Sequence, residues 1–242
     1  MNLNHKAFQL WENGQLNEAV QLLFEEIEKN DENSDSYCNL ASIFILAKKY
    51  DDAQVVLETA HEKYPNHIEL LYTFGNLYYQ KNNSTLALKY FYQVFNGNED
   101  SLKKDATIMI GQCYLLLNEP KKALVYLITA YENNEKDSSI MILLGDCMMQ
   151  TSHFKEAKNY YMKAWEVSPK NDEILFKRGL VGAALKEEPE IFNDFFEQSK
   201  KLNPKKYQKR LQQIKDIETF IYSQKNNTQP INENELNDRK DG

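Results

Sequence analysis

The chain has 242 residues, 42% of them hydrophobic, with only 8 glycines and 6 prolines, which indicates a folded and helix-rich protein. Its formal net charge of −7 argues against nucleic-acid binding driven by bulk electrostatics. Three cysteines do not suggest a disulfide framework, no signal peptide is apparent, and the apolar runs are too short to span a bilayer. We therefore expect a cytoplasmic protein without membrane insertion.

An alanine recurs at a nearly constant interval along most of the chain. Ala19, Ala53, Ala87, Ala123 and Ala157 are separated by 34, 34, 36 and 34 residues. A period in this range is typical of helical repeats, which stack on their neighbours to bury an apolar face. The two extra residues of the longer interval are predicted in a loop at 96–98, where glycine would end a helix in the left-handed conformation.

Two amphipathic helices are predicted in each period. The third unit carries Leu71, Phe74, Gly75 and Tyr78, whose spacings of three, one and three place them on one stripe of a first helix. The third member of this column is small in units two to five, which allows a neighbouring helix to approach closely. A second helix follows, because each alanine of the period is succeeded four positions later by an apolar residue. These residues are Leu23, Leu57, Phe91, Leu127 and Tyr161.

With these columns the chain resembles a tetratricopeptide repeat protein, whose unit is a helix–turn–helix of 34 residues. The second unit supplies Tyr37, Leu40, Ala41, Phe44, Ala53, Leu57, Ala60 and Pro65, and the fifth supplies Met141, Leu144, Gly145, Met148, Ala157, Tyr161, Ala164 and Pro169. The resemblance implies an all-α fold, a right-handed superhelical α-solenoid of antiparallel helix pairs.

The period also predicts the organisation of the chain. An array over 1–203 is divided into units at about 1–33, 34–67, 68–101, 104–137, 138–171 and 172–203. The first and sixth units depart from the pattern, as the ends of such arrays commonly do. A capping helix is predicted over 204–223, with Tyr207, Leu211, Ile214, Ile217 and Ile221 on its apolar face. The polar segment 224–242 is predicted to be disordered.

No catalytic constellation is found in the sequence. It contains neither a glycine-rich phosphate loop nor a metalloprotease histidine pair, and Cys38, Cys113 and Cys147 form no Cys-x-x-Cys motif. The four histidines lie in separate units without the spacing of metal ligands. We therefore predict a protein that is not an enzyme and that has no catalytic residue, metal site or cofactor.

The resemblance implies that the first helix of each unit lines a concave groove. Carried over position by position, the groove is apolar and aromatic, whereas a solvated wall would be polar, so the sequence predicts a partner there. Trp11, Tyr72, Tyr79 and Phe176 are the expected anchors, and Asn76, Gln112 and Asp146 form a polar ladder. The predicted partner-binding residues are Phe8, Trp11, Ile45, Tyr72, Asn76, Tyr79, Ile108, Gln112, Leu115, Asp146, Met149 and Phe176.

The function expected from this groove is that of a non-enzymatic scaffold or adaptor that binds a peptide or a helix of a protein partner. Three other readings compete with it for the same wall: a homodimeric regulatory subunit, a superhelix that buries its own wall, and occupation by the carboxy-terminal tail. A further alternative uses another part of the chain. Seven bases and no acid lie between Lys200 and Lys215, so the last helix could serve an RNA- or ribosome-associated factor.

Overall fold

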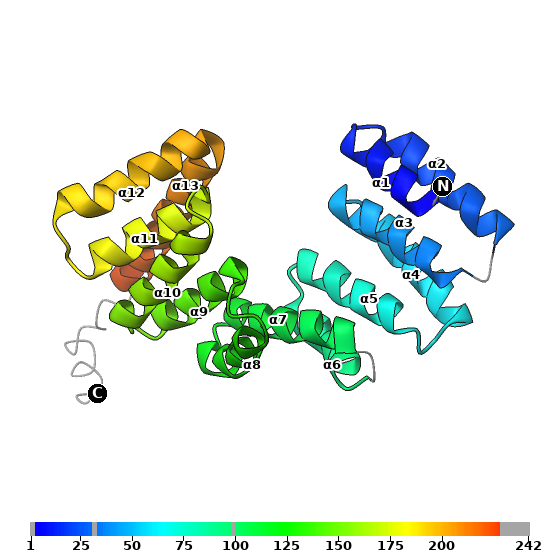
Figure 1. The fold of residues 1–242 in the computed structure, drawn as a ribbon, viewed down its shortest axis with the longest axis horizontal. Helices are drawn as coiled ribbons and strands as arrows, with labels where there is room; N and C mark the ends of the chain where they lie inside the picture. Colours follow the sequence, from blue (N-terminus) through cyan, green and yellow to red (C-terminus); the bar gives the residue numbers. More distant parts are fainter. Residues whose placement is uncertain (1–2, 31–32, 98–99, 228–242) are drawn as a thin grey trace, which may run out of the picture. The chain divides into compact units, whose positions relative to one another are not determined.

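The computed structural model describes residues 3–30, 33–97 and 100–227, and within these ranges the chain forms helices and no strand (Figure 1). The predicted all-α helical repeat architecture is therefore confirmed. The helices are α1 (Leu3–Glu12), α2 (Leu16–Lys29), α3 (Ser34–Leu46), α4 (Tyr50–Lys63), α5 (Ile68–Gln80), α6 (Ser84–Phe95), α7 (Asp100–Leu116), α8 (Pro120–Asn133), α9 (Ser138–Gln150), α10 (Phe154–Val167), α11 (Asp172–Ala184), α12 (Pro189–Leu202) and α13 (Pro204–Asn227).

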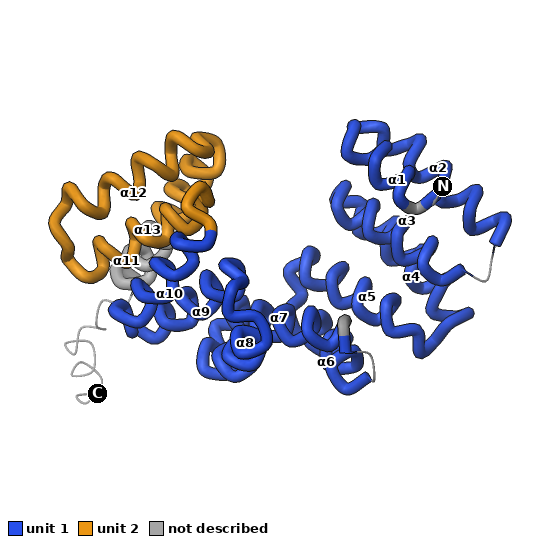
Figure 2. Tube along the Cα trace, viewed as in Figure 1, with its two compact units in different colours: residues 1–167 blue, residues 168–242 orange. Residues whose placement is uncertain are grey.

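The chain divides into two compact units, residues 1–167 and residues 168–242 (Figure 2). Unit 1 holds five consecutive helix pairs, from α1·α2 to α9·α10, and unit 2 holds α11, α12 and α13. Helix α13 continues four residues beyond the predicted end of the capping helix. The rest of the predicted tail, 228–242, lies outside the described residues.

One residue in each turn between paired helices adopts the left-handed backbone conformation. Its N–H neighbour closes the turn, as where Asn83 N donates to the carbonyl of Tyr78 at 2.8 Å. This is the hydrogen bond with which a helix ends at a left-handed residue. The same turn therefore ends six successive first helices, including that of the atypical sixth pair. The left-handed residues, with φ between 55° and 79°, are Gly14, Lys48, Asn82, Asn118, Ser152 and Lys186.

The extra residues of the long interval do not lie where the sequence predicted. Helix α7 has 17 residues, whereas α5 and α9 have 13, so the insertion lengthens the amino-terminal end of α7. Gly97 is not in the left-handed conformation. It is small for another reason, because a Cβ atom there would lie 2.6 Å from Cδ1 of Ile68. A tight contact with the preceding first helix explains this glycine better than a helix end.

Each pair packs a small residue of its first helix against a large residue of its second helix. A Cβ atom at Gly75 would lie 2.5 Å from the Phe91 ring, and one at Gly145 would lie 2.4 Å from the Tyr161 ring. Separations this short are not found between real atoms, so the two helices are closer than any side chain at these positions allows. The periodic alanines of the second helices are fully buried in the same layers.

The first helix of the array presents a polar outer face. Lys6 and Gln9 of α1 are exposed, whereas the equivalent Leu40 and Ile43 of α3 are fully buried against the preceding pair. The same positions of α7 and α9 are also apolar and buried. Because α1 carries polar groups there, its outer face is stable in water without a neighbouring helix.

Unit 2 is held together by ion pairs as well as by apolar contacts. Arg178 donates to Glu187 at 2.9 Å, and both side chains are shielded from solvent. Arg210 of α13 donates to Asp172 of α11 at 2.7 Å, and the Tyr207 ring packs against Phe176 with centroids 5.6 Å apart. Helix α13 is thereby fixed across α11 by one ion pair and one aromatic contact.

Candidate functional site

The first helices of unit 1 form a continuous surface. Helix α1 contacts α3, α3 contacts α5, α5 contacts α7, and α7 contacts α9. Among the described residues, second helices make no contacts of comparable extent with one another. The first helices therefore lie closer together than the second helices do, on the inner side of the curve that unit 1 follows (Figure 1).

One stripe of side chains on these helices faces outward, away from the core. Residues separated by seven and then four positions lie on one side of a helix, which gives three positions on each of α3, α5, α7 and α9. All of them are at least partly exposed. We call this set the first-helix stripe, and it consists of Phe8, Glu12, Asp35, Ser42, Leu46, Glu69, Asn76, Gln80, Asp105, Gln112, Leu116, Ser139, Asp146 and Gln150.

The structure places the predicted partner-binding residues on and beside this stripe. Phe8, Asn76, Gln112 and Asp146 belong to the stripe itself. A second group flanks it and is partly exposed, and this group contains Trp11, Tyr72, Tyr79, Ile108 and Met149. All nine residues are thus on the first-helix surface of unit 1.

The expected exposure is wrong for Ile45, Leu115 and Phe176. Ile45 and Leu115 are only 8% and 9% exposed, because they pack toward the next first helix along the array. Phe176 is 4% exposed and belongs to unit 2, where its ring lies 5.4 Å from Phe196 and 5.6 Å from Tyr207. These side chains support the core rather than a binding surface.

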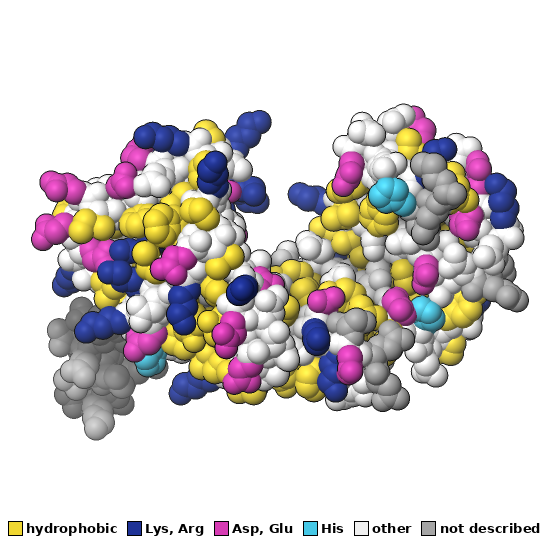
Figure 3. All heavy atoms as spheres, viewed as in Figure 1, with side chains coloured by type: hydrophobic (Ala, Val, Ile, Leu, Met, Phe, Trp, Pro, Cys, Tyr) yellow, Lys and Arg dark blue, Asp and Glu magenta, His cyan; other side chains and the backbone are white. Residues whose placement is uncertain are grey.

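Two exposed leucines escaped the sequence analysis. Leu46 and Leu116 are the last residues of α3 and α7, and they are 52% and 56% exposed. Each follows a buried residue, Ile45 or Leu115, so one step of 100° along the helix separates core from solvent. In Figure 3, hydrophobic side chains reach the surface over α3, α7 and α9, with charged side chains between them. The position four residues after the predicted polar ladder would have identified both leucines.

The polar ladder is organised by hydrogen bonds to tyrosines. Tyr161 donates its hydroxyl proton to Asp146 at 2.7 Å. Burial, followed by the Asp105 carboxylate, raises the pKa of Tyr72 to about 12, and a hydrogen bond with Asn76 acts in the opposite direction. Tyr72 also packs edge-on against Phe91, with centroids 5.6 Å apart. The ladder is therefore a set of oriented polar groups beside aromatic rings.

A cleft of about 580 Å³ opens next to the stripe, between α7, α8 and the start of α9. Ile108 and Ile140 supply apolar walls, while Asp105, Asn133 and Asp137 supply hydrogen-bonding groups. Apolar walls with a few polar groups suit an inserted side chain or a short peptide segment. The cleft thus adds a concave feature to the surface at α7.

The three cysteines are buried, and burial raises the pKa of each thiol to about 12. Since the thiolate is the reactive form, the folded protein should be nearly inert toward a disulfide reagent at pH 8, with all three thiols reacting once urea unfolds it. A thiol titration with and without urea checks this expectation. One thiol that reacts rapidly without urea would contradict it.

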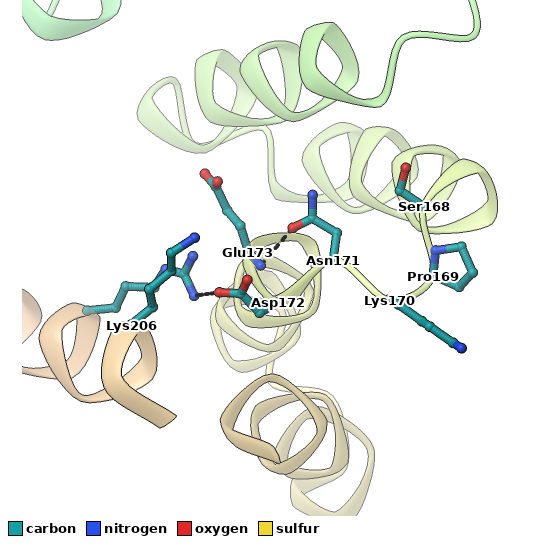
Figure 4. Close-up of a pocket in the computed structure, with 8 residues that line it drawn as sticks. Ser168, Pro169, Lys170, Asn171, Asp172, Glu173 and Lys206 are labelled. Atoms are coloured by element: carbon teal, nitrogen blue, oxygen red, sulfur yellow. Dashed lines mark hydrogen bonds and ion pairs between the residues drawn. The ribbon is translucent and has the colours of Figure 1, made fainter. Parts of the chain in front are cut away.

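A second cleft, of about 590 Å³, lies within unit 2 and is mainly polar (Figure 4). Its groups are committed to structure: Asn171 accepts from Glu173 N at 2.9 Å and caps α11, and Asp172 pairs with Arg210. Lys200 of the predicted basic run also pairs, with Glu197 at 3.6 Å. Part of the basic run is therefore neutralised within the chain.

Two further features bear on the class of protein. Among the described residues, no group of three or more histidine, cysteine, aspartate or glutamate side chains could hold a metal ion. None of the helices that the structure describes combines the length and apolar character needed to cross a membrane.

Two segments of the chain match family models described as tetratricopeptide repeat, residues 35–67 and residues 138–171. No curated protein sequence matches significantly. The two matched segments are the second and fifth helix pairs, where the sequence pattern is most complete.

Solved structures share the fold at low sequence identity. PilW, a widely conserved type IV pilus biogenesis factor, has a TM-score of 0.76 at 16% identity, covering 86% of this chain and 96% of its own. PilF of Pseudomonas aeruginosa has a TM-score of 0.69 at 16% identity, covering 87% and 96%. YrrB, described as a TPR protein with an unusual peptide-binding site, has a TM-score of 0.56 at 23% identity, covering 76% and 93%.

These likenesses establish the fold, and the family-model matches establish the repeat. The helix pairs, the recurrent left-handed turn and the buried small residues are the features that such a repeat requires. The chain belongs to the tetratricopeptide repeat proteins.

Proposed function

We propose that this protein is a non-enzymatic interaction scaffold that binds a peptide or helix of a partner on the first-helix stripe of unit 1. Tetratricopeptide repeats generally mediate protein–protein interaction. The observation that carries the proposal is the exposure of Leu46 and Leu116 beside partly exposed aromatic residues on one face. Apolar surface gathered in this way is typical of a binding site.

Three other features support binding rather than catalysis. The thiols are buried and protonated, which removes the strongest nucleophiles of the chain from use. The cleft at α7 offers a recess for a side chain of the partner. YrrB, which has a similar fold, is described as having a peptide-binding site.

The test compares exposed apolar residues on opposite faces of unit 1. Partners are recovered from the native host with the tagged chain, and their affinity is then measured with purified components. The double variant Leu46→Ser, Leu116→Ser should weaken binding by about 10-fold or more, because each buried leucine contributes about 1.5–3 kcal/mol. Both leucines are exposed in the free protein, so we expect thermal stability to stay nearly unchanged.

The matched control is Val55→Ser, Val125→Ser. These valines are 63% and 64% exposed and lie on the second helices α4 and α8, so the change removes similar apolar area from the other face. Binding should be retained by this control. Equal losses in the two variants would contradict the proposal, and loss of RNA co-sedimentation in Lys205→Glu, Lys209→Glu would favour the nucleic-acid alternative instead.

A further inference from the structure

The first-helix stripe is strongly biased in charge. Five of its residues are acidic, Glu12, Asp35, Glu69, Asp105 and Asp146, and none is lysine, arginine or histidine. The net charge of the whole chain, −7, arises from 36 acids and 29 bases, so a surface of this size would ordinarily carry several cations. The absence of cations from the stripe therefore needs an explanation.

The charge and the apolar groups lie at opposite edges of the stripe. Asp35, Glu69 and Asp105 form one edge, near the amino-terminal ends of α3, α5 and α7. Leu46 and Leu116 lie at the other edge, eleven residues further along their helices, which corresponds to about 16 Å. Polar residues such as Asn76 occupy the middle. A complementary ligand would be cationic along one side and apolar along the other.

Helix stability explains only part of the acidic edge. Asp35 and Glu69 lie in the first turns of their helices, where a carboxylate is favoured by the helix dipole. Asp105 is not in a first turn, because α7 begins at Asp100. Its carboxylate instead faces the stripe closely enough to raise the pKa of Tyr72, after burial as the larger cause. A structural role for the whole row is therefore insufficient.

The groups around the row leave much of its charge uncompensated. Glu69 contacts His67 at 2.9 Å. The Lys103 ammonium lies 5.2 Å from the centre of the Phe95 ring, at the cleft beside α7. Asp35 and Asp105 are exposed. Charges at the edge of an apolar surface act more strongly on a bound ligand than charges surrounded by water do.

We propose that the partner segment recognised by the first-helix stripe is a basic amphipathic peptide, with lysine or arginine along the edge of Asp35, Glu69 and Asp105 and apolar residues against Leu46 and Leu116. This inference rests on the proposed function and adds the chemical class of the ligand. Cation–carboxylate contacts at this edge would orient the peptide and accelerate its association.

The experiment selects peptides from a random 16-residue library displayed on phage, with the full chain as bait and the Leu46→Ser, Leu116→Ser variant as counter-selection. Enriched sequences should combine lysine or arginine with leucine or aromatic residues. A synthetic version of the best peptide is then compared with one in which every lysine and arginine is replaced by glutamate. The basic peptide should bind at least about 10-fold more tightly at low salt, and the difference should shrink as salt screens the charges.

Charge variants of the protein assign the effect to the stripe. Asp35→Asn, Glu69→Gln, Asp105→Asn should weaken binding of the basic peptide by about 10-fold and flatten its salt dependence. The control Asp52→Asn, Glu62→Gln, Glu132→Gln removes the same number of charges from exposed sites on α4 and α8 and should change binding by less than about 2-fold.

The outcomes separate the two proposals. Enrichment of acidic or uncharged peptides that still depend on Leu46 and Leu116 would overturn the basic ligand while leaving the binding surface in place. Equal effects of the stripe variant and the control would overturn it as well. If no sequence is enriched over the counter-selection, peptide binding at this surface fails, and the ligand class fails with it.

Discussion

Replacement of Glu187 by alanine is expected to destabilise the helices of unit 2 by about 3–5 kcal/mol, the usual cost of leaving one partner of a buried ion pair alone. Arg178 is 5% exposed and donates to Glu187 at 2.9 Å, and its guanidinium lies 4.7 Å from the centre of the Phe195 ring. Without the carboxylate this cation remains in an apolar environment. Hydrogen exchange followed by mass spectrometry should show the loss of protection in peptides from α11 and α12.

The apolar double variant is the control for this prediction. Arg178→Met with Glu187→Leu removes both charges and keeps most of the buried volume, so it should be much more stable than Glu187→Ala alone. A double variant as unstable as Glu187→Ala would show that the lost packing, rather than the unpaired cation, causes the effect. Unchanged exchange in Glu187→Ala would refute the importance of the ion pair.

The sixth helix pair shows how a departure from the repeat pattern can carry information. Gly182 stands where most other units have an aromatic residue, and the sequence alone presents this as decay of the pattern. In the structure a Cβ atom at Gly182 would lie 2.8 Å from Oε2 of Glu187 and 3.0 Å from Nη1 of Arg178. The glycine therefore makes space for the ion pair. Sequence periodicity could not show this, because the partner residues lie outside the repeated columns.

The core of the array was predictable because its requirements repeat. The alanine column and the small residues of the first helices reappear in the structure as buried layers, and the period of 34 residues reappears as one turn geometry at six positions. Each of these features depends on contacts within one pair or between adjacent pairs. Such contacts are the same in every unit, so a pattern in the sequence is enough to predict them.

The binding surface was less predictable, because exposure depends on the packing of one first helix against the next. Ile45 and Leu115 were expected in the groove, yet they pack toward the following first helix, and Leu46 and Leu116 face solvent instead. An error of one residue rotates a helix position by about 100°. Spacing along the chain identified the correct helices and the correct face but not the exact centre of that face.

Replacement of Gly145 by alanine is expected to destabilise the α9·α10 pair by about 1–3 kcal/mol, the usual cost of overpacking a core. The new Cβ atom would lie 2.4 Å from Cε1 of Tyr161. That ring cannot easily move, because it is fully buried and its hydroxyl is hydrogen-bonded to Asp146 at 2.7 Å. Chemical denaturation should show a lower unfolding free energy, and hydrogen exchange should place the change in α9 and α10.

The second unit supplies the control for this replacement. There Ala41 occupies the position of Gly145, and Leu57 occupies the position of Tyr161, with both side chains fully buried. The pair Gly145→Ala, Tyr161→Leu reproduces that combination, so the alanine should be less harmful once the ring is gone. The double variant should be more stable than the sum of the two single effects predicts, by about 1 kcal/mol. Strict additivity would show that the ring does not limit the approach of α9 to α10, and that the glycine is present for another reason.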